Sequence, residues 1–442
     1  MKNYFIKYIT ASCLTLFALS TFGQGLQLAT MSDIGQVNLT NPANMPNKRF
    51  YLNLSSPFVS MGTNISGAKV YQISNGLIPG FIDLDALTEE NSFDINGSNP
   101  IGFGFKKDKW AFNAHYSPTL NSQLSFNQDF FGFLTQGNAA YTGQTLNLDP
   151  NLDLSLYQEF GFGVSREVLG IFNVGVRGKF LSGIMNIGTL QSSLALTTSD
   201  DIYQLDAAAN YQLRVSGLPQ INTLDDLNSI DSTVSNSIGL SGNSGFAFDI
   251  GVTMNVGEML HLGVSILDIG SINWTNNSYQ YGLSSEFSFE GVDALDFLSG
   301  NNSSSILDTL NLDNLVDVSS NSTSFSTSLN TKTYITARLK LGEKLYVNGV
   351  LRNEFTPSGI RTGFGVGAQK QFGKILNVGA MYSIQNNSFA NIGANLVLKL
   401  GPAQIFVISD NLLPLANPWQ LSNTNVRLGA NITLNDKEKE GN

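Results

Sequence analysis

The chain reads Tyr157-Gln-Glu-Phe-Gly-Phe-Gly-Val-Ser165 and, after a short turn, Phe172-Asn-Val-Gly-Val-Arg-Gly-Lys-Phe180. Successive side chains of a strand point to opposite faces, so each arm of this predicted hairpin has one face of Phe and Val. The other face carries glycine together with Glu159, Arg177 and Lys179. A water-soluble sandwich also alternates in this way. Here the pattern recurs as far as the C-terminus and follows an export signal, so we expect the apolar face to contact lipid.

The N-terminus has the features of a signal peptide. Two lysines precede the apolar run Ile9–Phe22. The small-x-small tripeptide Thr21-Phe22-Gly23 at the end of this run is typical of a cleavage site. The apolar run is too short for a membrane-spanning helix. We therefore predict a signal peptide over 1–23, and a mature chain that begins at Gln24 or Gly25.

Composition limits how the mature chain can cross a membrane. Charged residues make up 13% of the sequence, about half the usual share, yet no mature segment has about 18 consecutive apolar residues. Any membrane span is therefore expected to be a strand. The formal net charge of −10 argues against nucleic acid and anionic lipid surfaces as partners. The single cysteine, Cys13, lies in the predicted signal peptide, so we expect neither disulfides nor thiolate metal sites.

Short turns and long connections alternate along the chain, and their number predicts the size of the sheet. We expect an all-β fold, a transmembrane antiparallel β-barrel of about fourteen strands (range about 12–16), each mostly about 9–14 residues long. Short turns face the periplasm in such barrels, so both termini are expected there. The tight turns are expected at 107–109, 167–170, 256–259, 342–344, 373–374 and 400–402. The longer connections are expected at about 60–99, 118–155, 185–244, 268–330, 355–360, 385–387 and 411–423.

The long connections are rich in Asn, Ser and Asp, and parts of them have helical spacing. Connections of about 60 residues without structure would be unusual, so we expect short helical insertions in the outer loops. Residues 203–215 are expected to be an additional strand or an extended ribbon. The amphipathic helices are expected at 81–87, 128–134, 223–230, 292–298 and 306–318. The predicted divisions are a signal peptide (1–23), an N-terminal hatch segment (24–48), the barrel (49–434) and a charged periplasmic tail (435–442).

Basic residues gather on the polar face of the strands, whereas acidic residues crowd the connections. This predicts a barrel interior with a basic wall beneath an acidic outer rim. A turn at 167–170 places Glu159 opposite Lys179 and diagonal to Arg177. Either these cations pair with carboxylates of the lumen or of folded-in loops, because unpaired charges are costly in a dry interior, or they hold an anionic ligand. The predicted lumen charge cluster comprises Glu159, Arg177, Lys179, Arg338, Arg352, Glu354 and Arg427.

The segment before the first strand ends in Asn41-Pro42-Ala43. A short segment ending in this tripeptide, followed by a barrel of about fourteen strands, resembles the FadL-type outer-membrane transporters of hydrophobic compounds. The resemblance implies that the segment is a hatch inside the barrel, with Asn41, Pro42 and Ala43 at the gate.

A second resemblance is to an uncharacterised outer-membrane group of Bacteroidota-type, Gram-negative bacteria within the same superfamily, a domain of unknown function. The PorV-type partner of the type IX secretion machinery also belongs to that superfamily. The terminal strand departs from common outer-membrane barrels because it ends without an aromatic residue. The pieces that carry the resemblance are Gly137-Asn138, Tyr157-x-Glu159, Arg177-x-Lys179 with Gly183, Asp410-Asn411 and Arg427-x-Gly429.

The sequence offers no catalytic constellation. His115 and His261 lie about 146 positions apart in or beside strands, and we interpret both as structural. No Gly-x-Ser-x-Gly elbow, His-Glu-x-x-His motif or P-loop is present. The acidic pairs Asp83-x-Asp85 and Asp149-x-x-x-Asp153 lack the ligand spacing of a calcium loop and are interpreted as solvated. We expect a protein that is not an enzyme, with no cofactor and no metal site.

Two functions fit these features. The first is passive uptake or binding of a hydrophobic or amphipathic small molecule through the barrel, across the hatch. The alternative is a non-transporting interaction or assembly protein of the outer membrane, whose loops bind secretion or surface proteins as a PorV-type barrel does. The expected partners are outer-membrane lipid and either a hydrophobic ligand or such a protein, with no nucleic acid. An apolar pocket in the lumen favours the first function, and a filled lumen with a large apolar patch on the loops favours the second.

Overall fold

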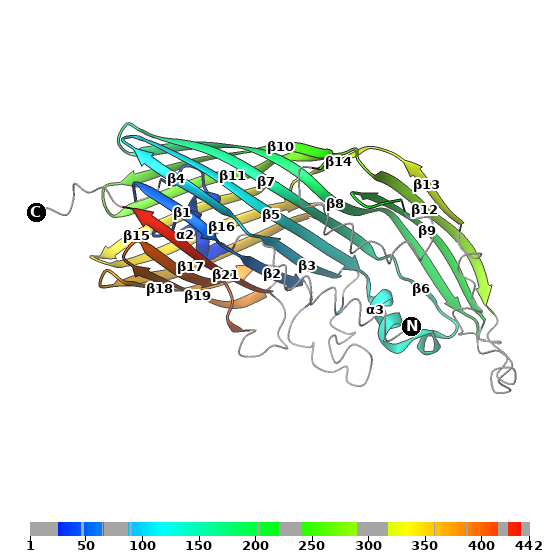
Figure 1. Cartoon of the computed structure of the whole chain (residues 1–442). Coiled ribbons are helices and arrows are strands. Elements are labelled where there is room, and N and C mark those ends of the chain that lie inside the picture. The colour runs from blue at the N-terminus through cyan, green and yellow to red at the C-terminus, as the bar shows by residue number, and fades with distance from the viewer. Residues whose placement is uncertain are drawn as a thin grey trace, which may run out of the picture.

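In a computed structural model the chain forms a closed antiparallel β-barrel with its N-terminal segment inside (Figure 1). Strand pairing runs around the whole sheet and closes where β1 and β2 pair with β21. The structure describes residues 25–45, 48–63, 65, 87, 91–200, 204–220, 241–289, 317–357, 359–385, 388–413 and 423–434.

Fourteen strand positions make up the ring, as the sequence predicted, and several positions consist of two or three consecutive segments. The first seven positions are β1 (Phe50–Ser55) with β2 (Phe58–Thr63), β3 (Asn91–Ser98) with β4 (Ile101–Lys107), β5 (Trp110–Phe126), β6 (Thr145–Asn147) with β7 (Asn151–Val168), β8 (Phe172–Thr198), β9 (Leu205–Ser216) with β10 (Asn243–Val256), and β11 (Leu260–Trp274) with β12 (Ser278–Phe289). The other seven are β13 (Asp317–Ser322) with β14 (Phe325–Ser328) and β15 (Lys332–Gly342), β16 (Leu345–Thr356), β17 (Gly359–Phe372), β18 (Leu376–Gln385), β19 (Ser388–Leu400), β20 (Ala403–Ser409) and β21 (Asn423–Leu434).

The outer surface of the barrel is apolar and its interior is polar, the reverse of a water-soluble protein. Phe162 and Phe246 are 68% and 72% exposed, whereas Arg177 is 1% exposed. A belt of this kind is stable only against lipid, so the barrel is built to span a membrane. No helix among the described residues has the length and apolarity needed to cross a membrane.

The hairpin that decides the fold has a register two residues away from the one expected. Val168 pairs with Phe172, and the turn consists of Leu169, Gly170 and Ile171, with φ values of +55° and +76° at the first two. The arms therefore extend past 167, and Gly161 rather than Glu159 is the direct partner of Lys179. The predicted direct opposition of Glu159 and Lys179 is wrong, because two left-handed residues close the turn later than the sequence suggested.

Several strands are far longer than expected, and they include many of the residues that were predicted to be in loops. β8 has 27 residues, which at about 3.3 Å per residue is several times the length that a membrane strand needs. Residues 118–126 and 185–198, expected in connections, continue β5 and β8, and β9 covers most of 203–215. With β12 and β13, these extensions form a sheet that projects beyond one side of the barrel (Figure 1).

The described helices are short. The helix predicted at 128–134 is confirmed as α3 (Gln128–Gln136), whose first turn is capped by Asn127 through a 2.9 Å hydrogen bond from Phe130 N. The short η3 (Asn138–Tyr141) follows it. Of the segment 306–318, only the end is described, and it belongs to strand β13. The other three predicted helices, the signal peptide 1–23 and the tail 435–442 lie outside the described residues.

The N-terminal segment crosses the barrel interior and consists of α2 (Leu26–Thr30) and η1 (Gly35–Leu39). One side of α2 is buried against the wall in a cluster formed by Leu26, Tyr334 and Met381. The other side packs through Leu28 against Val397 and neighbouring residues. Strands between β11 and β20 thus enclose this segment on two sides. We call it the hatch (residues 25–45).

Candidate functional site

The hatch rests on inward-facing glycines of the wall. A Cβ atom at Gly251 would lie 2.0 Å from Oδ1 of Asn41, and one at Gly175 would lie 2.3 Å from the carbonyl oxygen of Pro42. The Asn41 side chain donates to the carbonyl oxygens of Val252 (3.3 Å) and Val264 (3.2 Å). Inward-facing glycines of the neighbouring strands β8 and β10 therefore form a seat that admits the Asn-Pro-Ala backbone.

The beginning of the hatch is anchored on the opposite side of the barrel. Asp410 accepts hydrogen bonds from the backbone N–H groups of Leu26 (2.6 Å) and Gln27 (2.9 Å). The Gln27 side chain donates to the Ser409 carbonyl at 2.5 Å and accepts from Asn395 at 2.6 Å. Further along, Gln36 and Asn431 exchange two hydrogen bonds of 2.6 and 2.9 Å. Because each such bond contributes only about 1 kcal/mol net, the docking is specific without being covalent or permanent.

A charged layer lies immediately above the hatch. Arg177 donates to Asp249 at 3.0 Å, and Lys179 lies 3.1 Å from Asp249 and 3.3 Å from Glu159. Lys179 also contacts Asp268, which is 2.7 Å from Lys332. These six side chains form one connected ion-pair network, which we call the charge layer.

The other members of the predicted cluster lie elsewhere. Arg352 pairs with Glu354 at 2.5 Å as a separate unit. Arg427 donates to the carbonyl and hydroxyl of Ser56 at 3.1 Å, and its guanidinium lies 4.9 Å from the centre of the Phe58 ring. Arg338 is near the tight-turn end, with its guanidinium 4.7 Å from the centre of the Tyr346 ring. Of the predicted set, the structure therefore joins Glu159, Arg177 and Lys179 in one network and Arg352 with Glu354 in a separate pair.

The expected basic wall is instead balanced in charge. Among the described residues, five cations and five carboxylates of the wall form ion pairs with one another in the lumen, and Lys399 of the wall pairs with Asp33 of the hatch at 3.2 Å. The pairing of Arg177 and Lys179 with carboxylates removes the reason to place an anionic ligand between them. Most of the predicted acidic rim lies outside the described residues. The cations are Arg177, Lys179, Lys332, Arg352 and Arg361, and the carboxylates are Asp94, Glu159, Asp249, Asp268 and Glu354.

Sequence reasoning missed the two central carboxylates. Asp249 alternates with Phe248 and Ile250, which are exposed on the belt, so its inward position was readable from the strand period. Asp268 was assigned to the start of a connection. Asp268 has a φ of +63° and lies beside a register shift between β10 and β11, which turns its side chain into the lumen. The alternation of side chains along the strand does not predict this position.

An apolar layer lies above the charge layer. Leu181, Tyr157 and Trp274 are buried together, with Phe325 packed against them. Trp274 donates its indole N–H to Thr327 at 2.8 Å, which satisfies the polar atom of this otherwise apolar group. The interior thus changes from charged to apolar over one step along β8.

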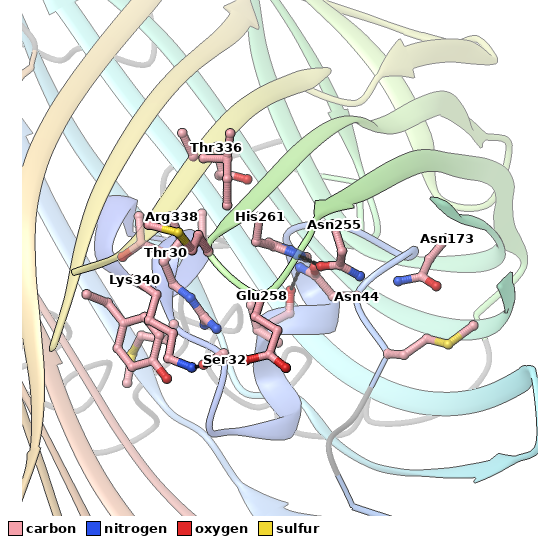
Figure 2. Close-up of a pocket in the computed structure, with 18 of the residues that line it drawn as sticks. Thr30, Ser32, Asn44, Asn173, Asn255, Glu258, His261, Thr336, Arg338 and Lys340 are labelled. Atoms are coloured by element: carbon pink, nitrogen blue, oxygen red, sulfur yellow. Dashed lines mark hydrogen bonds and ion pairs between the residues drawn. The ribbon is translucent and has the colours of Figure 1, made fainter. Parts of the chain in front are cut away.

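Beneath the hatch, at the tight-turn end, is a polar cavity of about 460 Å³ (Figure 2), which we call the vestibule. Thr30, Ser32 and Asn44 of the hatch contribute to its lining. The wall contributes mainly polar and charged side chains, as Figure 2 shows. These wall residues include Asn173, Asn255, Glu258, His261, Thr336, Arg338 and Lys340.

Both histidines make side-chain hydrogen bonds. His115 is 2.7 Å from Glu159 and so joins the charge layer, and His261 Nδ1 is 2.6 Å from Asn255 Oδ1 in the vestibule. Among the described residues, no group of three or more His, Cys, Asp or Glu side chains is arranged to hold a metal ion.

The inward-facing residues of β8 therefore contribute to four successive layers of the barrel interior, counted from the tight-turn end. Asn173 lines the vestibule, Gly175 seats the hatch, Arg177 and Lys179 form the charge layer, and Leu181 belongs to the apolar layer. This arrangement places a polar cavity on one side of the hatch and, beyond the charge layer, a packed apolar layer on the other.

Several solved structures are similar to this chain at low sequence identity. The Ralstonia pickettii toluene transporter TbuX has 12% identity and a TM-score of 0.47, with 94% of this chain and 97% of that chain covered. The Pseudomonas putida toluene transporter TodX has 10% identity and a TM-score of 0.43, with 93% and 98% covered. A Pseudomonas aeruginosa FadL homologue has 9% identity and a TM-score of 0.45, with 92% and 95% covered.

No curated protein matches the chain. A family model, described as a family of unknown function (DUF5723), matches residues 42–410. That match covers most of the sequence, from the Pro of the hatch tripeptide to the aspartate that anchors the start of the hatch. The chain belongs to this family of unknown function, DUF5723.

Proposed function

We propose that this protein is an outer-membrane channel for the passive entry of an amphipathic small molecule, gated by the hatch. The observation that carries the proposal is the non-covalent seat of the hatch directly above the vestibule. Asn41 and Pro42 occupy a glycine seat on the wall, and a cavity of about 460 Å³ lies directly beneath. A segment held in this way blocks the lumen, yet it is able to leave when its hydrogen bonds are exchanged for others.

The order of the layers supports an amphipathic solute. The apolar layer around Leu181 and Trp274 suits the apolar part of a molecule arriving from the outer end. The charge layer below it is internally paired and so offers hydrogen bonds without a net charge that would select one sign. The vestibule then offers a polar chamber on the periplasmic side.

A disulfide across the seat tests the gate. The mature chain is predicted to have no cysteine, so the pair Asn41→Cys and Gly251→Cys would be the only thiols present. A Cβ at Gly251 lies 2.0 Å from Oδ1 and 2.9 Å from Cγ of Asn41, which is compatible with the reach of a disulfide. Proteoliposomes containing the oxidised variant are expected to lose entry of amphipathic test compounds, and reduction is expected to restore it. Each single-cysteine variant is the control.

The two competing functions give different results in this experiment. Entry that is the same in oxidised, reduced and protein-free vesicles for a full series of aliphatic and aromatic amphiphiles would contradict a channel. Purification from outer membranes in mild detergent adds an independent measure. A stoichiometric protein partner without any bound small molecule would point instead to the interaction or assembly function.

A further inference from the structure

Arg338, an inward-facing residue of β15 that lines the vestibule, has no carboxylate partner among the described residues. Its guanidinium lies 4.7 Å from the centre of the Tyr346 ring. The hatch carboxylate Asp33 acts on Arg338 from beyond ion-pair distance. Asp33 is already engaged by Lys399 at 3.2 Å and by a hydrogen bond from Asn377. The ring therefore holds a guanidinium whose charge is not paired within the described part of the chain.

Arg338 belongs to a row of three vestibule side chains on neighbouring strands. His261 pairs with Arg338 across β11 and β15, and Asn255 pairs with His261 across β10 and β11. The Nδ1 atom of His261 is 2.6 Å from Oδ1 of Asn255, so a hydrogen bond fixes the imidazole. Figure 2 shows the three side chains in the lining of the cavity beneath the hatch. A few polar groups held in place in this way are typical of a binding site for a small molecule.

The lining of the vestibule has an excess of positive charge, although the chain as a whole has a formal net charge of −10. Its charged residues are three cations and two carboxylates, namely Lys106, Arg338, Lys340, Glu167 and Glu258. The ion pair between Lys340 and Glu258 is long at 3.7 Å, and the Glu258 side chain is 93% exposed. Because an exposed pair of this kind contributes little, Lys340 is able to turn toward an anion bound at Arg338.

The size of the vestibule and its apolar lining indicate more than a bare ion. Its volume of about 460 Å³ lies within the range of about 300–1,000 Å³ that is usual for small organic ligands. Met45 of the hatch and Met259 and Leu260 of the wall add apolar surface to the lining. Methionine is flexible and polarisable, so it adapts to apolar groups of different shape.

We propose that the vestibule binds a small organic anion, with its carboxylate or phosphate group at Arg338 and its apolar part against the methionines. The guanidinium fork presents parallel N–H groups to such an anionic group, and Lys340 supplies a second positive charge. The exposed side chains of Glu258 and Met259 lie at the rim, so the cavity is reached from the tight-turn end. Binding requires no movement of the hatch, so the inference holds whether or not the barrel transports its ligand.

Calorimetric titration of the full chain in lipid nanodiscs tests the site, with empty nanodiscs as the blank. The probes are hexanoate, hexyl phosphate, neutral hexanol, acetate and inorganic phosphate. We expect hexanoate, hexyl phosphate or both to bind at least about tenfold more tightly than the other three probes, because only they combine a charged acceptor with an apolar chain. Comparison of the two hexyl anions identifies the anionic group that the site prefers.

Three variants assign the binding to the vestibule. Arg338→Gln removes the charge and the fork, and we expect it to weaken binding of the hexyl anion by about tenfold or more. Arg338→Lys keeps the charge without the fork, so an intermediate affinity is expected. Arg166→Gln is the matched control, because Arg166 also lies over a ring, that of Trp110 at 4.8 Å, but on the exposed outer surface. It is expected to leave the affinity unchanged.

A second substitution keeps the test decisive if Arg338→Gln does not fold. Lys340→Glu breaks only the exposed pair with Glu258 and places a carboxylate beside the site, so the same loss of affinity is expected.

Three results would overturn the inference. The first is that neither hexyl anion binds, or that hexanol, acetate or inorganic phosphate binds as tightly as they do. The second is an affinity that neither Arg338→Gln nor Lys340→Glu changes. The third is an equal loss of affinity in Arg338→Gln and Arg166→Gln, which would assign the effect to the overall charge of the protein.

Discussion

Arg177 donates two hydrogen bonds of 2.5 Å to Asn38, one to the backbone carbonyl and one to the side-chain oxygen. The same guanidinium pairs with Asp249 at 3.0 Å. This relationship ties the hatch directly to the charge layer of the barrel wall. Moving the hatch removes two acceptors from a guanidinium whose side chain is 1% exposed, so the closed state is favoured.

Arg177→Lys tests this tie. Lysine keeps the positive charge for Asp249 but cannot reach Asn38 and the carboxylate together, because it lacks the planar fork of arginine. We expect a folded barrel with higher ion leakage in planar bilayers than the original protein. Arg166→Lys is the matched control, because Arg166 lies over the Trp110 ring at 4.8 Å, on the strand next to β8. Equal leakage in the two variants would contradict a latch at Arg177.

The glycine seat predicts that one added methyl group is enough to displace the hatch. Gly175→Ala places a Cβ 2.3 Å from the Pro42 carbonyl, whereas Gly178→Ala on the same strand meets no atom within 4 Å. We expect only the first substitution to raise leakage and to make the hatch sensitive to added protease. A closed and protected hatch in Gly175→Ala would show that the seat has more room than the structure indicates.

The charge layer predicts a large difference between two acidic substitutions. Asp268→Asn leaves Lys179 and Lys332 short of a buried counter-charge, for which the expected loss in the free energy of unfolding is about 3–5 kcal/mol. Glu258→Gln breaks the ion pair between Glu258 and Lys340. Because the Glu258 side chain is 93% exposed, the expected loss in the free energy of unfolding is only about 0–1 kcal/mol. Urea titration of the refolded barrels measures both values. Similar losses in the two variants would argue against a dry charge layer.

The apolar belt predicts where a charge is not tolerated. Phe162 is 68% exposed on the belt, six residues before the end of β7, so Phe162→Arg is expected to destabilise the barrel in lipid vesicles by about 2–4 kcal/mol. Leu169 is 83% exposed in the tight turn, and Leu169→Arg is expected to have almost no effect. The comparison is made by reversible unfolding from vesicles of one lipid composition. A stable Phe162→Arg barrel would mean that this surface does not contact the hydrocarbon core.

Alternation along single strands was enough to predict the membrane belt, and the succession of short turns and long connections predicted the number of strands. Alternation is a local property with a period of two, so Phe162 and Val164 can be assigned to one face without knowledge of any partner. A close backbone approach at Gly175 could also have been predicted from the sequence, because glycine inside a strand often marks a site where another backbone comes close. The fit of Gly175 to Pro42 could not, since that contact joins residues 133 positions apart.

Register and closure decided what the sequence left open. The later turn shifted the register of this hairpin by two residues, so that Gly161 replaced Glu159 as the cross-strand partner of Lys179, and it did not change the face of any residue. The ion-pair partners of Arg177 and Lys179, Asp249 and Asp268, could be identified only from the tertiary structure. It places β10 beside β8 and β11 beside β10. The sequence by itself thus determined which side chains point inward, because that depends on the neighbouring residue. Only the tertiary structure decided which of them meet, because that depends on strands brought together from distant parts of the chain.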